Sequence, residues 1–100
     1  MILAQLSIAP VGKGISLSSY VQIVIDILEA EGVSFQTNPM STTIETQDLT
    51  TLFTIVQKAH TAVINAGAKR VITELKIDDR YDKYVTMESK LKHLKFSKET

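Results

Sequence analysis

The chain repeats one pattern, a strand followed by a helix and a second strand, and this repetition restricts the folds that it can adopt. Hydrophobic periodicity predicts, in order, a strand at 2–9, a helix at about 16–31, strands at 33–38 and 42–46, a helix at about 48–66 and a strand at 70–78. Gly32 and Gly67, 35 positions apart, supply the helix stops. Two right-handed crossovers joined by a hairpin predict an α+β ferredoxin-like βαββαβ sandwich, with strand order 4-1-3-2 and both helices on one face.

Composition favours one globular domain spanning 1–100, because 44% of the residues are hydrophobic and only two prolines and four glycines are present. The formal net charge is zero, so no global field favours nucleic acid or an anionic membrane as a partner. The absence of cysteine excludes disulfides and thiolate chemistry and agrees with a cytoplasmic location. Residues 1–9 are apolar but lack a basic lead, so a strand is predicted there and not a signal sequence.

The two predicted helices differ in the apolar surface that they present. Ser16 or Ser18 is the candidate N-cap of the first helix, and Asp48 is that of the second. Polar residues of the first helix form one narrow stripe, Ser19, Gln22, Asp26 and Glu29. The second helix is predicted to turn inward Leu49, Leu52, Phe53, Val56, Ala59 and Val63. A short docked helix is predicted from the spacing of Met87, Leu91 and Leu94. Either the second helix and this C-terminal segment or another subunit must cover the first helix.

The sheet face without helices is predicted to be polar. Side chains alternate between faces along a strand, so turning Leu6, Ile44 and Leu75 toward the helices sends their neighbours to the other side. The residues placed there are Gln5, Ser7, Gln36, Asn38, Thr43, Glu45, Glu74 and Lys76. Two interpretations stay open for this face. It is a solvated surface or polar subunit interface, or it is a small-molecule pocket.

Four short stretches are the most distinctive parts of the sequence: 7–12, 16–21, the Asn-Pro-Met-Ser-Thr-Thr-Ile-Glu turn at 38–45, and Arg70-Val71 with 76–80. In order and spacing they resemble the small thiamine-binding domain family along nearly the whole chain. The resemblance implies a ferredoxin-like fold, homodimers that pair as tetramers, and binding of thiamine or its hydroxymethylpyrimidine portion with no required cofactor. Ser41 and Thr46 depart from the family pattern, in which glycine is more common, and these changes could narrow the pocket.

Ser7, Asn38, Thr43 and Glu45 are the candidate ligand-binding residues. An aminopyrimidine presents ring nitrogens and an exocyclic amine in one plane, so Glu45 is the preferred anchor, accepting from the amine or pairing with a protonated ring nitrogen. The other three would satisfy the remaining donors and acceptors. The thiazolium charge of whole thiamine would also favour a pocket with carboxylates, in agreement with Glu45 and Glu74. Because Glu74 is assigned to an edge strand, it is expected to matter less than Glu45.

No catalytic or metal-binding constellation is predicted. His60 lacks a partnering acidic, His or Cys cluster and is interpreted as a packed helix residue. The acidic loop at 78–83 is interleaved with cations and is interpreted as ion-paired and solvated. Tyr20 and Phe35 are interpreted as core residues, although either ring could stack on a ligand. The first interpretation is a non-catalytic binder or carrier of thiamine. A structural or regulatory homo-oligomer and a small cofactor-free enzyme are the alternatives.

Overall fold

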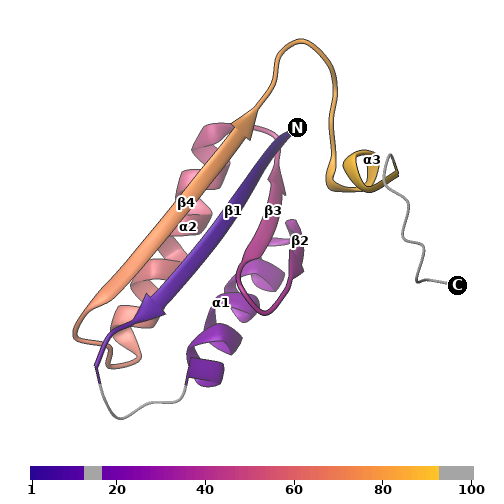
Figure 1. Cartoon of the computed structure of the whole chain (residues 1–100). Helices are drawn as coiled ribbons and strands as arrows, with labels where there is room; N and C mark the ends of the chain where they lie inside the picture. Colours follow the sequence, from indigo (N-terminus) through magenta and orange to yellow (C-terminus); the bar gives the residue numbers. More distant parts are fainter. Residues whose placement is uncertain (13–16, 93–100) are drawn as a thin grey trace, which may run out of the picture.

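Two helices that end at glycines and a tight hairpin determine the fold (Figure 1). The structure is a computed structural model, and it describes residues 1–12 and 17–92. Its elements are β1 (Ile2–Pro10), α1 (Leu17–Glu31), β2 (Ser34–Thr37), β3 (Thr42–Thr46), α2 (Leu49–Asn65), β4 (Val71–Asp79) and α3 (Met87–Lys92). Gly32 and Gly67 have φ angles of +71° and +113°, which glycine adopts without the penalty that other residues incur. Both predicted helix stops are therefore confirmed.

The four strands form one antiparallel sheet in the order β2-β3-β1-β4, which is the predicted order 4-1-3-2 read from the other edge. Both α1 and α2 lie behind this sheet in Figure 1, so the ferredoxin-like arrangement is confirmed. β1 pairs with β4 over its full length, from Ile2 to Pro10, but with β3 only from Ile2 to Leu6. The stretch from Ser7 to Pro10 therefore has a neighbouring strand on one side only.

The core lies between the sheet and the two helices. Its largest cluster of buried side chains comprises Leu6, Tyr20, Val24, Leu28, Ile44, Ile55, Ala59 and Val63. The prediction that Leu49 and Phe53 face inward is wrong, because they are 38% and 51% exposed. The buried positions of α2 are Leu52, Ile55, Ala59 and Val63, which follow one side of the helix at intervals of three and four residues. Leu49 and Phe53 fall on the flank of that side.

The predicted N-cap of the second helix is confirmed, and one of the two candidates for the first helix is excluded. Asp48 caps α2 as predicted, since its Oδ1 accepts a hydrogen bond from the Thr51 backbone N–H at 2.7 Å. This bond holds the pKa of the Asp48 carboxyl below its usual value of 3.8. Ser18 lies inside α1 and so does not precede it as an N-cap, and Ser16 lies outside the described residues.

The chain after β4 turns back past the start of β1, and α3 stands to the side of the sheet near β3 (Figure 1). There Val85 and Met87 pack on Leu3, and none of the three is more than 8% exposed. Lys90 forms an ion pair with Asp78 of β4, with 2.5 Å between Nζ and Oδ2. The predicted docked helix is thus present as α3, although Leu94 lies outside the described residues.

Coverage of α1 is incomplete within the part of the chain that the structure describes. Tyr20 is 3% exposed and Phe35 packs against the same core, which supports the core interpretation of both rings. Val21, one position beyond Tyr20, remains 38% exposed. Since α3 docks at Leu3 on the opposite face of the sheet, part of the apolar surface of α1 stays open to another partner.

Candidate functional site

The face of the sheet that α1 and α2 leave uncovered, called here the open face, carries the polar side chains that the sequence predicts for it. Leu6 and Ile44 lie in the core, so their neighbours along the strands point away from the helices. Strand register gives three rows across the face: Leu3 between Glu45 and Asp78, Gln5 between Thr43 and Lys76, and Ser7 beside Glu74. We call the first row the Leu3 end. The last row, together with the turn at 38–41, is the Ser7 end.

Two hollows adjoin at the Ser7 end. The smaller, of about 140 Å³, lies between β1, the turn at 38–41 and α1, and its walls include Ile8, Val21 and Asn38. The larger, of about 510 Å³, lies on the open face, and its walls include Gln5, Glu74 and Lys76. Ser7, Met40 and Ser41 line both. Because a protein cavity of about 150 Å³ can hold benzene, the smaller hollow is on the scale of one six-membered ring.

Main-chain groups of β1 edge the smaller hollow. The Val11 N–H donates to the Arg70 carbonyl at 2.8 Å, and this bond fixes which residues of β1 bond to β4. Since main-chain groups alternate sides along an antiparallel strand, odd-numbered residues of β1 face β4 and even-numbered ones face β3. Leu6 is the last even-numbered residue that pairs with β3. Over residues 1–12 and 17–92, the N–H and C=O of Ile8 therefore have no strand partner, and both point toward the hollow.

The turn at 38–41 is held in shape by its own side chains. The Asn38 Oδ1 accepts hydrogen bonds from the backbone N–H groups of Met40 at 2.8 Å and Ser41 at 2.9 Å. The Asn38 N–H donates to the Ser41 carbonyl at 2.9 Å, and the Gln5 Nε2 donates to the Ser41 Oγ at 3.0 Å. The side-chain oxygen of Asn38 is therefore engaged in the turn. Its side-chain nitrogen, Nδ2, is left as the group that can donate to a ligand.

The four predicted ligand residues fall into two pairs. Ser7 and Asn38 both line the smaller hollow. Thr43 is on the same face but lines neither hollow, and it sits across from Gln5. Glu45 lies further away at the Leu3 end, where its Oε1 is 3.4 Å from the Met87 backbone N–H at the start of α3. The structure thus brings Ser7 and Asn38 together and sets Glu45 apart from them.

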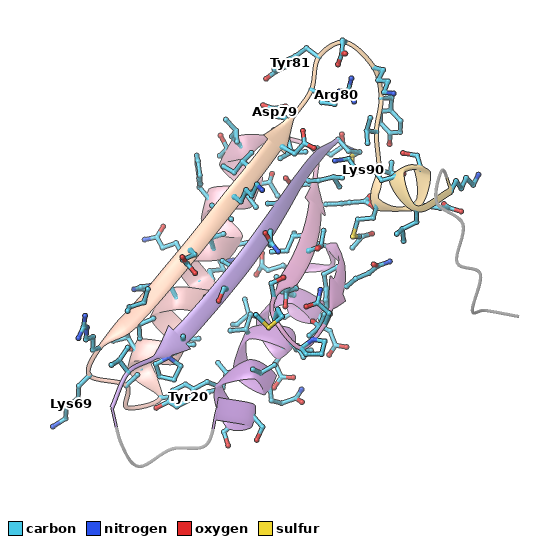
Figure 2. The ribbon with its side chains drawn as sticks, in the orientation of Figure 1. Tyr20, Lys69, Asp79, Arg80, Tyr81 and Lys90 are labelled. Atoms are coloured by element: carbon cyan, nitrogen blue, oxygen red, sulfur yellow. The ribbon has the colours of Figure 1, made fainter. Side chains whose placement is uncertain are left out.

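The acidic loop at 78–83 forms a network of ion pairs and hydrogen bonds, as predicted. Figure 2 shows Asp79, Arg80 and Tyr81 at the top of the molecule, while Tyr20 and Lys69 lie at the opposite end. A hydrogen bond from Arg80 lowers the pKa of Asp82 to about 2. The Tyr81 hydroxyl donates to the Asp79 Oδ2 at 2.9 Å, and this bond raises the pKa of the tyrosine. These carboxylates are stabilised by the loop itself, far from the two hollows.

Neither a metal centre nor a histidine–acid pair is found over residues 1–12 and 17–92. No group of three or more His, Cys, Asp or Glu side chains in these ranges is arranged to hold a metal ion. The Nδ1 of His60 lies 2.7 Å from the Thr73 hydroxyl in a partly buried contact between α2 and β4, which supports its interpretation as a packed residue. No helix in the same ranges is long and apolar enough to cross a membrane.

Met40 and the main chain of Ile8 are site groups that no sequence pattern predicts, whereas Ser41 is expected from the family pattern to narrow the pocket. Met40 is 84% exposed and stands at the junction of the two hollows. The Asn-Pro turn marks the position of Met40 but not its role. Ile8 carries an apolar side chain, so residue type alone gives no sign that β3 ends before reaching it.

Comparison with known proteins places this architecture in a family. The family model described as thiamine-binding protein matches residues 4–95. A UPF0045 protein of Methanothermobacter thermautotrophicus is 45% identical over 83 residues, which cover 82% of this chain and 84% of that protein. The UPF0045 protein YqgV of Bacillus subtilis is 44% identical over 103 residues, covering 94% of this chain and 98% of its own.

Solved structures share the same fold. A hypothetical protein of Methanocaldococcus jannaschii superposes with a TM-score of 0.84 at 40% identity, covering 92% of this chain and 93% of that one. A candidate thiamine biosynthesis/salvage protein of Thermotoga maritima superposes with a TM-score of 0.80 at 20% identity, covering 92% and 96% of the two chains. At that identity, the second likeness shows the fold alone.

Proposed function

Because the chain belongs to the thiamine-binding protein family, we propose that it binds thiamine or its hydroxymethylpyrimidine portion at the Ser7 end of the open face and releases it unchanged. The observation that carries the proposal is the smaller hollow, which has the size of a single ring and is edged by main-chain groups of Ile8 that have no strand partner on the β3 side among the described residues.

The chemistry of the smaller hollow suits an aminopyrimidine. Its apolar walls include Val21 and Val24 of α1, against which the faces of a planar ring can pack. The N–H and C=O of Ile8 point the same way, so they offer one donor and one acceptor to a ring nitrogen and the exocyclic amine beside it. The Ser7 hydroxyl and the Asn38 amide nitrogen stand at the same hollow for the remaining polar atoms of the ligand.

Thr43 and Glu45 complete the set of predicted ligand residues, and both stay predictions. Thr43 would have to act from the neighbouring row of the open face, beyond Gln5. Glu45 would have to reach the ligand from the Leu3 end, where it already lies near the Met87 N–H. Thr43→Val and Glu45→Gln test the two roles directly, since each substitution keeps the size of the side chain and removes one polar feature.

We propose a carrier or binder in the cytoplasm, with no catalytic step and no required cofactor. The polar groups at the two hollows include hydroxyls, amides, one glutamate and one lysine. Such groups can hold and orient a ligand by hydrogen bonds and charge. The histidine that the structure describes, His60, is engaged with Thr73 between α2 and β4, away from these hollows.

We also propose that the protein is a homo-oligomer, a dimer or tetramer. Phe53 and Ile72 are 51% and 47% exposed, and the apolar surface of α1 is incompletely covered around Val21. Large exposed apolar side chains in so small a chain favour burial against further subunits. Sedimentation at micromolar concentration should show an assembly, and a monomer would contradict this part of the proposal. A structural oligomer without a small ligand is the alternative if assembly occurs and no ligand binds.

Native mass spectrometry on protein purified without denaturation tests the proposed function, because a bound ligand is seen as added mass. Ser7→Leu should abolish binding of hydroxymethylpyrimidine in a calorimetric titration, because a larger apolar side chain at the junction of the two hollows would obstruct the ligand and remove the hydroxyl. Gln36→Leu is the matched control, since Gln36 is exposed on the same face and lines neither hollow. Absence of any ligand in the isolated protein, together with no binding by the wild type, would overturn the proposal.

A further inference from the structure

The open face carries two glutamates, and their surroundings differ. Glu45 is half-buried at the Leu3 end, with its Oε1 3.4 Å from the Met87 N–H. Glu74 is exposed, lines the larger hollow, and makes no hydrogen bond or ion pair with the described residues. A carboxylate whose oxygens are unoccupied can accept a ligand without first giving up a protein contact. Glu74 meets this condition better than Glu45.

Glu74 lies next to a residue that lines the smaller hollow. Strand register sets Glu74 directly across from Ser7, and Ser7 lines both hollows. A ligand whose ring fills the smaller hollow and whose second part passes Ser7 therefore meets Glu74 on entering the larger one. Lys76 lines the larger hollow as well, but its partner in the register is Gln5, one row further from the junction.

We propose that Glu74 is the specificity-determining residue for a two-part ligand, recognising a cationic group attached to the ring held in the smaller hollow. This inference rests on the proposed function and deepens it: Glu74 makes the site prefer thiamine, whose thiazolium is positively charged, over uncharged hydroxymethylpyrimidine. The larger hollow, of about 510 Å³, has room for the second ring. The sequence predicts the opposite order of importance for Glu45 and Glu74, because it does not show that α3 lies against Glu45.

The expected effect is modest because Glu74 is exposed to solvent. Charge pairs at such positions are weakened by water and salt, so losing the carboxylate should weaken thiamine binding by about 3- to 5-fold. The same change should leave hydroxymethylpyrimidine binding within about twofold of the wild type, since that ligand brings no positive charge to the larger hollow. Raising the salt concentration should reduce the preference for thiamine in the wild type and have little effect in the variant.

The experiment is a calorimetric titration of thiamine and hydroxymethylpyrimidine into the wild type, Glu74→Gln and Glu45→Gln, with the oligomeric state of each checked by sedimentation. The two variants make the same chemical change at opposite ends of one face. The inference is supported if Glu74→Gln loses affinity for thiamine while keeping its affinity for hydroxymethylpyrimidine, and Glu45→Gln shows no such thiamine-specific loss. It is overturned if Glu74→Gln weakens both ligands equally or neither, or if Glu45→Gln produces the thiamine-specific loss.

Failure of the proposed function would look different. If the assembled wild type binds neither ligand, the proposed function falls and the role of Glu74 falls with it. If the wild type binds both ligands with equal affinity at low salt and Glu74→Gln changes nothing, the proposed function stands and the role of Glu74 alone is rejected.

Discussion

The two ends of the open face carry similar side chains and have different surroundings. At the Leu3 end, Leu3 is 7% exposed because Val85 and Met87 pack on it. At the Ser7 end, no such segment packs over the face within the described chain, and Met40 is 84% exposed above two hollows. A polar strand pattern therefore does not identify a binding surface by itself. The segment that returns to cover one end decides where a ligand has room.

Chain geometry explains why the Leu3 end is the covered one. β4 ends at Asp79, which pairs with Ile2 at the start of β1. The chain leaving β4 is therefore already beside the Leu3 end, and it needs only the short stretch 80–86 to bring Met87 onto Leu3. At the other end, β1 outruns β3 beyond Leu6, so the sheet itself leaves an edge open beside the hairpin turn.

The largest change in the free energy of unfolding is expected from a substitution at the Leu3 end. Leu3→Ala should lower the free energy of unfolding by about 2 to 3 kcal/mol, because it empties a contact that buries Val85 and Met87. Ser7→Ala on the same strand and face should change it by less than about 0.5 kcal/mol. Chemical denaturation of both variants measures the difference. Equal losses would contradict this expectation, because they would show that the two ends are packed alike.

The Asp48 cap gives the next largest effect and a dependence on pH. Asp48 lies beside the start of β1, and Asp48→Ala should lower the Tm by roughly 4 to 8 °C at neutral pH through loss of the bond to the Thr51 N–H. Because the pKa of Asp48 is lowered in the folded state, the cap stabilises above the usual value of 3.8 and is lost as the pH falls through the lowered value. The Tm of the variant and that of the wild type should therefore converge in acid. A Tm difference that persists undiminished at pH 2 would contradict a charged cap.

The smallest change in stability is expected from the ion pair that links α3 to β4. Lys90→Gln removes the ion pair with Asp78, in which both side chains are nearly half exposed. Exposed pairs contribute little to global stability, so the denaturation midpoint should not change measurably. Hydrogen exchange should nevertheless speed up at the Met87 N–H and leave the turn at 38–41 unaffected. If exchange instead speeds up at 38–41, the Leu3 end and the Ser7 end are coupled and do not behave as separate regions.

Much of the fold is predictable because it rests on local rules. Side chains alternate along the strands, which places Ser7, Thr43 and Glu45 on one face. Glycines with positive φ end both helices. The inward face of α2 is predicted less well, since Leu49 and Phe53 have the right residue type but lie on the flank of the buried stripe. Residue type alone does not reveal where a partly apolar helix surface ends.

The site is predicted only in part because it depends on contacts between distant segments. Register between β1 and β3 is not fixed by any turn, since a helix and β2 separate them in the sequence. That register puts Glu45 across from Leu3, and it leaves Ile8 paired with Thr73 of β4 but with no described partner on the β3 side. The docking of α3 against Leu3 is likewise a tertiary contact that helical spacing near Met87 does not locate. Ser7 and Asn38 both line the smaller hollow, which agrees with the predicted strand order that brings the turn at 38–41 beside β1.

The most direct test of the central claim, that the Ser7 end binds and the Leu3 end is structural, is a titration of ¹⁵N-labelled protein with hydroxymethylpyrimidine followed by amide NMR shifts. The account predicts the largest shifts at Ser7, Ile8 and the turn residues Met40 and Ser41, with the Ile8 N–H moving downfield as it gains an acceptor. Amides at the Leu3 end should stay in place. Shifts that centre on Leu3 and the Met87 N–H, with Ile8 unmoved, would contradict the account and return the ligand to Glu45.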